Sequence, residues 1–164
     1  MSAAGMGFGA LLITVKRASC HPGWGVPEAF ELFVAREKRK ETFTVVRSRW
    51  ERAHDTRLLE DAEREQQPKR RTPTIARAHL AVDARIGRQI RKAIESLSLP
   101  LTVAAPMYGM DGTMIGVVFG EQFASCEFHW WVEAPEEWKG LGLVADEVVK
   151  LAARAVFIGE QLEL

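Results

Sequence analysis

Residues 29–50 read AFELFVAREKRKETFTVVRSRW, and this stretch decides the fold class. In its first part, 29–36, large apolar residues alternate along the chain, so one face of an extended strand is wholly apolar. Its second part, 42–50, is rich in threonine, valine and phenylalanine, which favour strands. The polar residues 37–40 lie between the two parts. The stretch therefore predicts an antiparallel hairpin with a long, basic tip.

Further strands are expected elsewhere in the chain. They cover 11–18, 74–81, 113–119 and 122–132, with a short extended piece over 101–106. The strands over 113–119 and 122–132 form a second hairpin, since Gly120 and Glu121 make the bend between them.

Two amphipathic helices are also expected. The first covers 84–98, because Asp83 is a suitable N-cap, Pro100 ends the pattern and one stripe is apolar. The second begins at Pro135, and its buried stripe comprises Trp138, Leu141, Val144, Ala145, Val148, Leu151 and Ala152. Together these elements predict an α+β fold, a mostly antiparallel sheet of about five to six strands with two amphipathic helices on one face.

The chain has 164 residues, of which 47% are hydrophobic and 27% are charged. This length and composition predict a single domain over 1–164. Residues 51–71 differ from the rest, since they are almost entirely charged or polar. Leu58 and Leu59 can anchor one short helix around 54–65, and the rest of this segment is expected to be an exposed, mobile connection.

The composition disfavours several classes of protein. The two cysteines, Cys20 and Cys126, are too few for a disulfide-rich secreted scaffold. The longest apolar runs are too short to cross a membrane, and no membrane is expected as a partner. Residues 1–9 contain no basic residue and no long apolar stretch, so a signal peptide is not expected. We therefore expect a cytoplasmic protein.

Basic and acidic residues are unevenly distributed, although the net charge is zero. Residues 36–92 contain 17 basic and 9 acidic residues, whereas residues 121–164 contain 3 basic and 9 acidic residues. Two interpretations stay open. The charges serve solubility alone, or the folded protein has a basic face and an acidic face that steer its partners.

Four cysteine and histidine residues raise the question of a metal site: Cys20, His21, Cys126 and His129. On one strand, positions 126 and 129 point to opposite faces, and adjacent residues such as 20 and 21 rarely hold one ion. We expect no metal and no cofactor, and we interpret Cys126 as a small core residue.

The sequence does not indicate a catalytic site. Ser125, Glu127 and His129 share one strand face, but such neighbours are about 6.5–7 Å apart, whereas a nucleophile and its base need about 3 Å. Asp111 before Gly112 is typical of a turn. We therefore expect a protein that is not an enzyme and has no catalytic residue.

Two other features suggest binding. Trp130 and Trp131 are consecutive on a strand, so one faces the core and the other is either covered by another segment or anchors a partner. Basic clusters at 36–40 and 69–71 can neutralise the phosphates of a nucleic acid. Aromatic residues are not interleaved with these clusters, so solvated loops are the other interpretation.

The last third of the chain resembles a known type of sequence. Asp111-Gly112-Thr113 precedes a strand, and CEFHWWVEAPEEW follows at 126–138. This order is similar to the ending of small uncharacterised bacterial α+β proteins, in which a DGT turn leads through a hairpin to a WW…PxxW strand–helix junction. In size and style the whole chain is similar to immunity proteins that block bacterial toxins, which are cytoplasmic, catalytically inert and often α+β.

The favoured hypothesis is a non-enzymatic binding protein, and in its sharpest form an immunity-type inhibitor of a bacterial toxin or effector. The partner would be a cognate toxin domain, whose basic cleft an acidic surface can occupy. The candidate contact residues are Trp131, Glu127, Glu133, Glu136, Glu137, Asp146 and Glu147. The alternative is a nucleic-acid-associated accessory protein that uses the basic clusters at 36–40 and 69–71. A small hydrolase is a third class.

Overall fold

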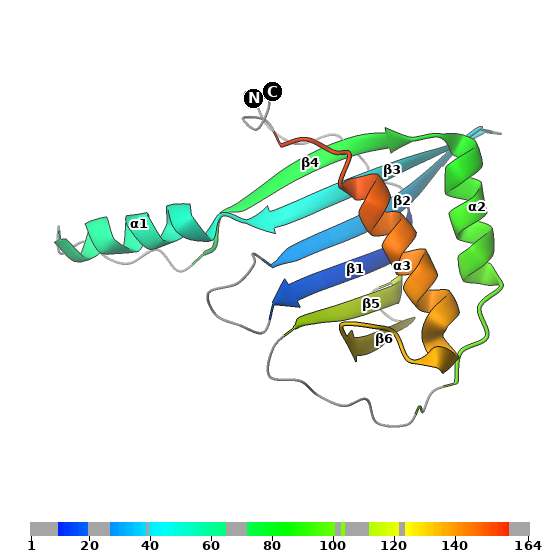
Figure 1. Cartoon of the computed structure of the whole chain (residues 1–164). Helices are drawn as coiled ribbons and strands as arrows, with labels where there is room; N and C mark the ends of the chain where they lie inside the picture. Colours follow the sequence, from blue (N-terminus) through cyan, green and yellow to red (C-terminus); the bar gives the residue numbers. More distant parts are fainter. Residues whose placement is uncertain are drawn as a thin grey trace.

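A computed structural model describes residues 10–19, 27–38, 40–64, 72–100, 103, 112–121 and 124–157. In this part of the chain, six strands form one antiparallel sheet in the order β4-β3-β2-β1-β5-β6 (Figure 1). The strands are β1 (Ala10–Ser19), β2 (Glu28–Glu37), β3 (Lys40–Trp50), β4 (Ile75–Val82), β5 (Thr113–Glu121) and β6 (Ala124–Trp131). The predictions of an α+β class and of an antiparallel sheet are confirmed, and each strand agrees with its expected range to within two residues. The extended piece expected over 101–106 lies outside the described residues, apart from Val103.

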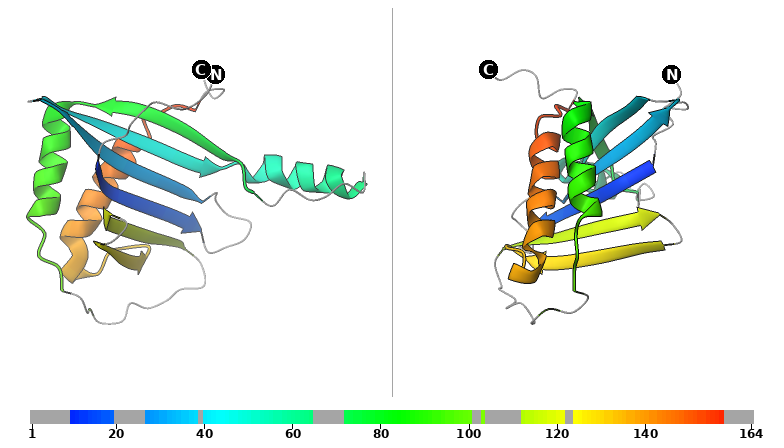
Figure 2. Two further views of the ribbon diagram at one scale, coloured as in Figure 1. Left: turned by 180° about the vertical axis from the view of Figure 1, so that it is seen from behind. Right: turned by 90° about the vertical axis from the view of Figure 1, so that its right-hand side faces the viewer.

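The described residues form three α-helices: α1 (Arg52–Arg64), α2 (Ala84–Glu95) and α3 (Lys139–Ala152), with a short 3-10 helix, η1 (Glu136–Trp138), before α3. Two of them, α2 and α3, correspond to the two amphipathic helices expected from the sequence, and α1 corresponds to the short helix expected around 54–65. Both α2 and α3 lie over the same face of the sheet (Figure 2). In contrast, α1 extends away from the sheet beyond the end of β3 (Figure 1). None of these helices is both long and apolar enough to cross a membrane.

The helix expected over 84–98 ends three residues early. Asp83 caps its first turn as predicted, because Oδ1 of Asp83 accepts the backbone N–H of Arg85 at 2.8 Å. At the other end, the hydroxyl of Ser96 donates to the carbonyl of Ala93 at 2.8 Å and occupies an acceptor that the next helical turn would need. The apolar pattern continues to Leu97, which packs against the core from outside the helix.

The core lies between the sheet and the two helices α2 and α3. Strand pairing places Ile13 opposite Leu32, and Leu32 opposite Val45, and all three side chains are fully buried. Above them α3 contributes one buried stripe, since Leu141, Val144 and Val148 recur at helical spacing. The predicted stripe of this helix is therefore its buried face. The other face of the sheet is not covered by any described helix (Figure 2).

Candidate functional site

The end of the sheet next to α1 carries a row of charged side chains on the helix side. Arg17 on β1 is paired in register with Glu28 on β2, and Glu28 with Arg49 on β3. Because residues opposite one another in a sheet project from the same face, these three side chains share the face that α3 covers further along. Neither α2 nor α3 lies over this end of the strands (Figure 1). The row is therefore the polar border of the core.

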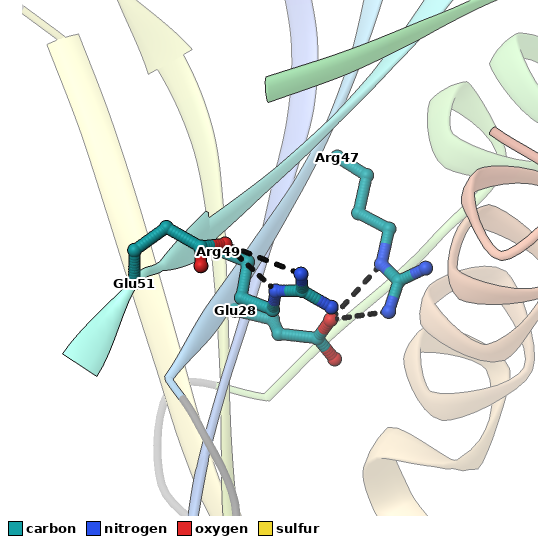
Figure 3. Close-up of polar contacts among 4 residues, drawn as sticks. All are labelled: Glu28, Arg47, Arg49 and Glu51. Atoms are coloured by element: carbon teal, nitrogen blue, oxygen red, sulfur yellow. Dashed lines mark hydrogen bonds and ion pairs between the residues drawn. The ribbon is translucent and has the colours of Figure 1, made fainter. Parts of the chain in front are cut away.

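Most of these charges are paired within the protein. Nε and Nη2 of Arg47 donate to Oε1 of Glu28 at 2.9 and 2.6 Å, and Arg49 donates to Oε1 of Glu51 at 3.2 Å (Figure 3). The side chains of Arg47 and Glu28 are 22% and 17% exposed, so water screens this pair only in part. This cluster links β2 and β3 and leaves little of its charge for a ligand.

Both arginines also contact an aromatic ring. The guanidinium carbons of Arg47 and Arg49 lie 4.9 and 4.4 Å from the ring centroid of Phe157, a cation–π geometry. Phe157 is buried with Ala155 and Ala78 in a second small core cluster. No local sequence pattern indicates this contact, because Phe157 is more than a hundred residues from either arginine along the chain.

A cavity of about 370 Å³ lies beside this cluster, between α3 and the ends of β1 and β5. Its floor and walls are mainly apolar, and two charged side chains line it, Arg17 and Asp146. The complete lining is Val15, Arg17, Gly112, Thr113, Ile115, Val132, Ala145, Asp146 and Val149. The cavity thus combines an apolar interior with one charge of each sign.

One wall of the cavity depends on a close approach of the backbone. A Cβ added at Gly112 would lie 2.6 Å from Nε1 of Trp131 and 2.8 Å from Cγ2 of Val132, so only glycine fits between them. Val132 itself has a φ of 60°, which is rare and strained for a β-branched residue. Its backbone N–H donates to the carbonyl of Thr113 at 2.9 Å and holds it there. Such strain is concentrated at functional sites, and here it shapes the wall of a cavity.

Five of the predicted acidic residues lie on the loop after β6, on η1 and on α3. They are Glu133, Glu136, Glu137, Asp146 and Glu147, and all are exposed. The loop lies against α3, since a Cβ added at Gly142 would be 2.8 Å from Cβ of Ala134. We call these five residues, together with the two large exposed apolar residues among them, Val132 and Leu143, the acidic surface.

The other two predicted contact residues belong to the opposite side of the sheet. On β6 the side chains alternate, with Phe128 and Trp130 buried in the core, so Glu127 and Trp131 project from the uncovered face. Trp131 is half-buried beside Gly112. The structure therefore does not group the seven predicted residues around Trp131 as one surface.

Glu127 is engaged in a polar cluster of its own. Nζ of Lys16 lies 2.8 Å from Oε1 of Glu127, and Nε2 of His129 lies 3.4 Å from the same oxygen. The hydrogen bond from Lys16 is the main reason why the pKa of Glu127 is below its ordinary value. Gly116 makes room for the imidazole, because an added Cβ would be 3.1 Å from the ring of His129. All three side chains are exposed, so water screens their interactions and the cluster contributes little to stability.

The interpretation of Cys126 as a core residue is wrong, because its side chain is exposed. It shares its face of β6 with the buried Phe128 and Trp130, so alternation gave the correct face but not the burial. Among the described residues, no group of three or more histidine, cysteine, aspartate or glutamate side chains could hold a metal ion. Cys20 and His21 lie outside these residues.

The basic tip of the β2–β3 hairpin lies next to α2. Nη1 of Arg91 on α2 is 2.7 Å from Oε1 of Glu41 on β3, and this ion pair raises the pKa of Arg91. Arg36, Lys38 and Lys40 are exposed at the tip, and Arg85, Arg88 and Lys92 are exposed on α2. Arg39 and the cluster at 69–71 lie outside the described residues.

Comparisons with known proteins gave no matching family model, no similar curated protein and no similar solved structure.

Proposed function

We propose that the protein is a non-enzymatic cytoplasmic binding protein, and specifically an immunity-type inhibitor that neutralises a bacterial toxin or effector domain. The single observation that carries this proposal is the composition of the acidic surface. Leu143 is 65% exposed and Val132 is 52% exposed, and both have acidic residues as near neighbours along the chain, of which Glu136 pairs with Lys139 at 3.2 Å. Apolar anchors within a charged rim are the arrangement in which protein interfaces concentrate their binding energy.

The charges of this surface define the chemistry of the partner. Asp146 and Glu147 follow Leu143 by one helical turn on α3, and Glu133 follows Val132 in the adjoining loop. A basic cleft, such as the phosphate-binding cleft of a nuclease toxin, complements these carboxylates. In this arrangement Leu143 would enter an apolar site of the partner, and the acidic side chains would direct the encounter. Glu127 and Trp131 have no part in it, because they project from the other face of the sheet.

A second candidate function rests on a different observation. The hairpin tip and α2 together present six exposed basic side chains on one side of the molecule: Arg36, Lys38, Lys40, Arg85, Arg88 and Lys92. Such a surface supports the alternative of a nucleic-acid-associated accessory protein. Asp83, Glu37 and Glu95 lie among these residues and lower the local positive charge.

The test is binding to the product of the neighbouring reading frame, which the proposal requires to contain a toxin domain. We expect direct binding in calorimetry, weakening as salt rises from 0.05 to 0.3 M because the acidic surface is screened. Leu143→Ala should weaken binding about tenfold, as for a moderate interface anchor. Val156→Ala is the matched control, since Val156 is also 52% exposed but lies outside the acidic surface.

A charge-reversed pair separates the two functions. Asp146→Lys with Glu147→Lys should abolish binding to the toxin domain and leave any binding of DNA or RNA unchanged. Arg36→Glu with Lys38→Glu and Lys40→Glu should have the opposite effect. If the neighbouring product contains no toxin domain, or if the basic variant alone loses its ligand at about 0.15 M salt, the inhibitor proposal is wrong.

A further inference from the structure

The cavity beside α3 has features that the proposed function does not use. Its floor is formed by Val15 and Ala145, which are 1% and 2% exposed, and its upper wall by Ile115 and Val149. At about 370 Å³ it falls within the range of small-molecule sites, about 300–1,000 Å³. A cavity of this size accommodates a small molecule with an apolar group, but not a large cofactor.

Arg17 and Asp146 both line this cavity, and neither has an ion-pair partner among the described residues. The cross-strand neighbour of Arg17, Glu28, uses Oε1 to accept two hydrogen bonds from Arg47. The guanidinium of Arg17 thus keeps its donors available, whereas Arg47 and Arg49 donate theirs to carboxylates.

We propose that this cavity binds a free α-amino acid with an apolar side chain. The guanidinium of Arg17 suits the α-carboxylate, because its planar donors can pair with both oxygens. The carboxylate of Asp146 accepts from the α-ammonium group. The apolar side chain lies on the floor formed by Val15 and Ala145. A zwitterion satisfies both unpaired charges together, whereas a fatty acid or a simple amine satisfies only one.

Gly112 and the strained Val132 complete the site. Since Gly112 leaves room for Val132 to approach the start of β5, the side chain of Val132 forms the wall at that end. Thr113 adds a hydroxyl to the lining. This proposal does not depend on an inhibitor function, although Asp146 takes part in both.

The experiment is a titration of the purified full chain with L-leucine and L-phenylalanine. Binding is measured by calorimetry and by two-dimensional NMR. We expect saturable binding, with shifts confined to residues that line the cavity. N-acetyl-leucine lacks the ammonium group and leucinamide lacks the carboxylate, so each should bind at least about tenfold more weakly, as expected for a lost charge-assisted hydrogen bond. Equal affinity for all three compounds would refute the assignment of the two charges.

Two variants with matched controls locate the site. Arg17→Gln and Asp146→Asn should each weaken leucine binding about tenfold or more. In Arg17→Gln, leucine and leucinamide should bind with similar affinity, because the partner of the α-carboxylate is lost. Lys150→Gln and Glu147→Gln remove neighbouring charges on α3 outside the cavity and should leave the affinity unchanged. Arg17→Gln also separates the proposals, because Arg17 lies outside the acidic surface and its loss should not affect toxin binding. No binding of either amino acid at 10 mM, or equal loss in the control variants, would overturn the inference.

Discussion

Gly87 is the point at which α2 approaches the sheet most closely. A Cβ added there would overlap the ring of Phe43, a fully buried residue of β3. In a helix interior, alanine is ordinarily favoured over glycine by about 1 kcal/mol. Here we expect the reverse, because overpacking a dense core costs about 1–3 kcal/mol or more. Gly87→Ala should therefore lower the free energy of unfolding, measured by denaturant titration.

Gly140→Ala is the matched control for this prediction. A Cβ at Gly140 would lie 3.2 Å from Cδ2 of Leu97, the end of a flexible side chain that can move aside. This change should leave stability unchanged or raise it by up to about 1 kcal/mol. If both alanine variants gain stability, α2 does not pack against Phe43 as described.

A single carboxylate holds the base of α1. Oδ2 of Asp55 accepts the indole N–H of Trp50 at 2.7 Å and the backbone N–H of Thr74 at 2.8 Å. Hydrogen bonds from the Thr74 side chain, the Thr74 backbone and Trp50 lower the pKa of Asp55 from 3.8 to about 2. The carboxylate therefore joins the end of β3, the start of α1 and the residue before β4.

This anchor should depend on pH in one direction. The folded-state pKa is below the ordinary value, so the contribution of Asp55 is complete above about pH 4 and is lost as the pH falls toward 2. In wild-type protein, the protection factor of the Thr74 amide, which is its exchange rate relative to the unstructured peptide at the same pH, should fall across this window. In Asp55→Asn the same amide should already be less protected at neutral pH, with little further change in the protection factor on acidification. An unchanged rate in the variant would contradict the role of Asp55.

At the scale of elements, Phe157 and Ala155 pack the segment after α3 against the sheet. Phe157 is 4% exposed, packs with Ala78 on β4 and lies under the guanidinium groups of Arg47 and Arg49. Phe157→Ala removes this contact and should lower stability by about 3 kcal/mol, the low end for a buried phenylalanine. Val156→Ala, at an exposed neighbouring position, should change stability by less than about 0.5 kcal/mol. Thermal unfolding of the two variants measures the difference.

The elements themselves were largely predictable from local pattern. Alternation identified the strands, and the stripe containing Ile90 identified α2, because one buried face imposes its own period on the sequence. The start of α3 was less accurate. The chain from Pro135 first makes a 3-10 turn in which the indole N–H of Trp138 donates to the carbonyl of Pro100 at 3.0 Å. That acceptor is 38 residues away, and no local pattern records it.

The candidate site was only partly predictable, for a topological reason. Glu127 and Asp146 are close in sequence, yet they lie on opposite sides of the sheet. Side chains of β6 alternate between the two faces, and Glu127 projects from the uncovered one, whereas α3, which carries Asp146, packs on the other face. In contrast, Arg17 and Asp146 are far apart in sequence but line one cavity, because β5 inserts beside β1. Only the strand order brings them together, and composition and spacing do not determine it.

At the scale of the whole molecule, the sheet with α2 and α3 is one packed unit, and α1 is an appendage to it. The exposed residues of α1 include Leu58 and Leu59, at 40% and 39%, so this helix contributes little apolar burial. The ends of β3 and β4 meet independently of it. Trp50 pairs with Ile75, and the backbone N–H of Glu51 donates to the carbonyl of Thr74 at 2.9 Å.

This geometry predicts that the core folds without α1. Replacing residues 52–73 by Asn-Gly would join Glu51 to Thr74 through a two-residue turn, the loop length that antiparallel strands accept most readily. We expect a folded protein with lower helical circular dichroism, the NMR shifts of the β1–β2 and β5–β6 pairs retained, and cooperative unfolding. Stability should fall by no more than about 2 kcal/mol, since the bonds to Asp55 are lost while the shorter loop lowers the entropy of the unfolded chain. A variant with a Gly-Ser loop of the original length separates these two effects, because it loses the same bonds without shortening the loop. If both variants fail to fold, α1 is part of the core and not an appendage.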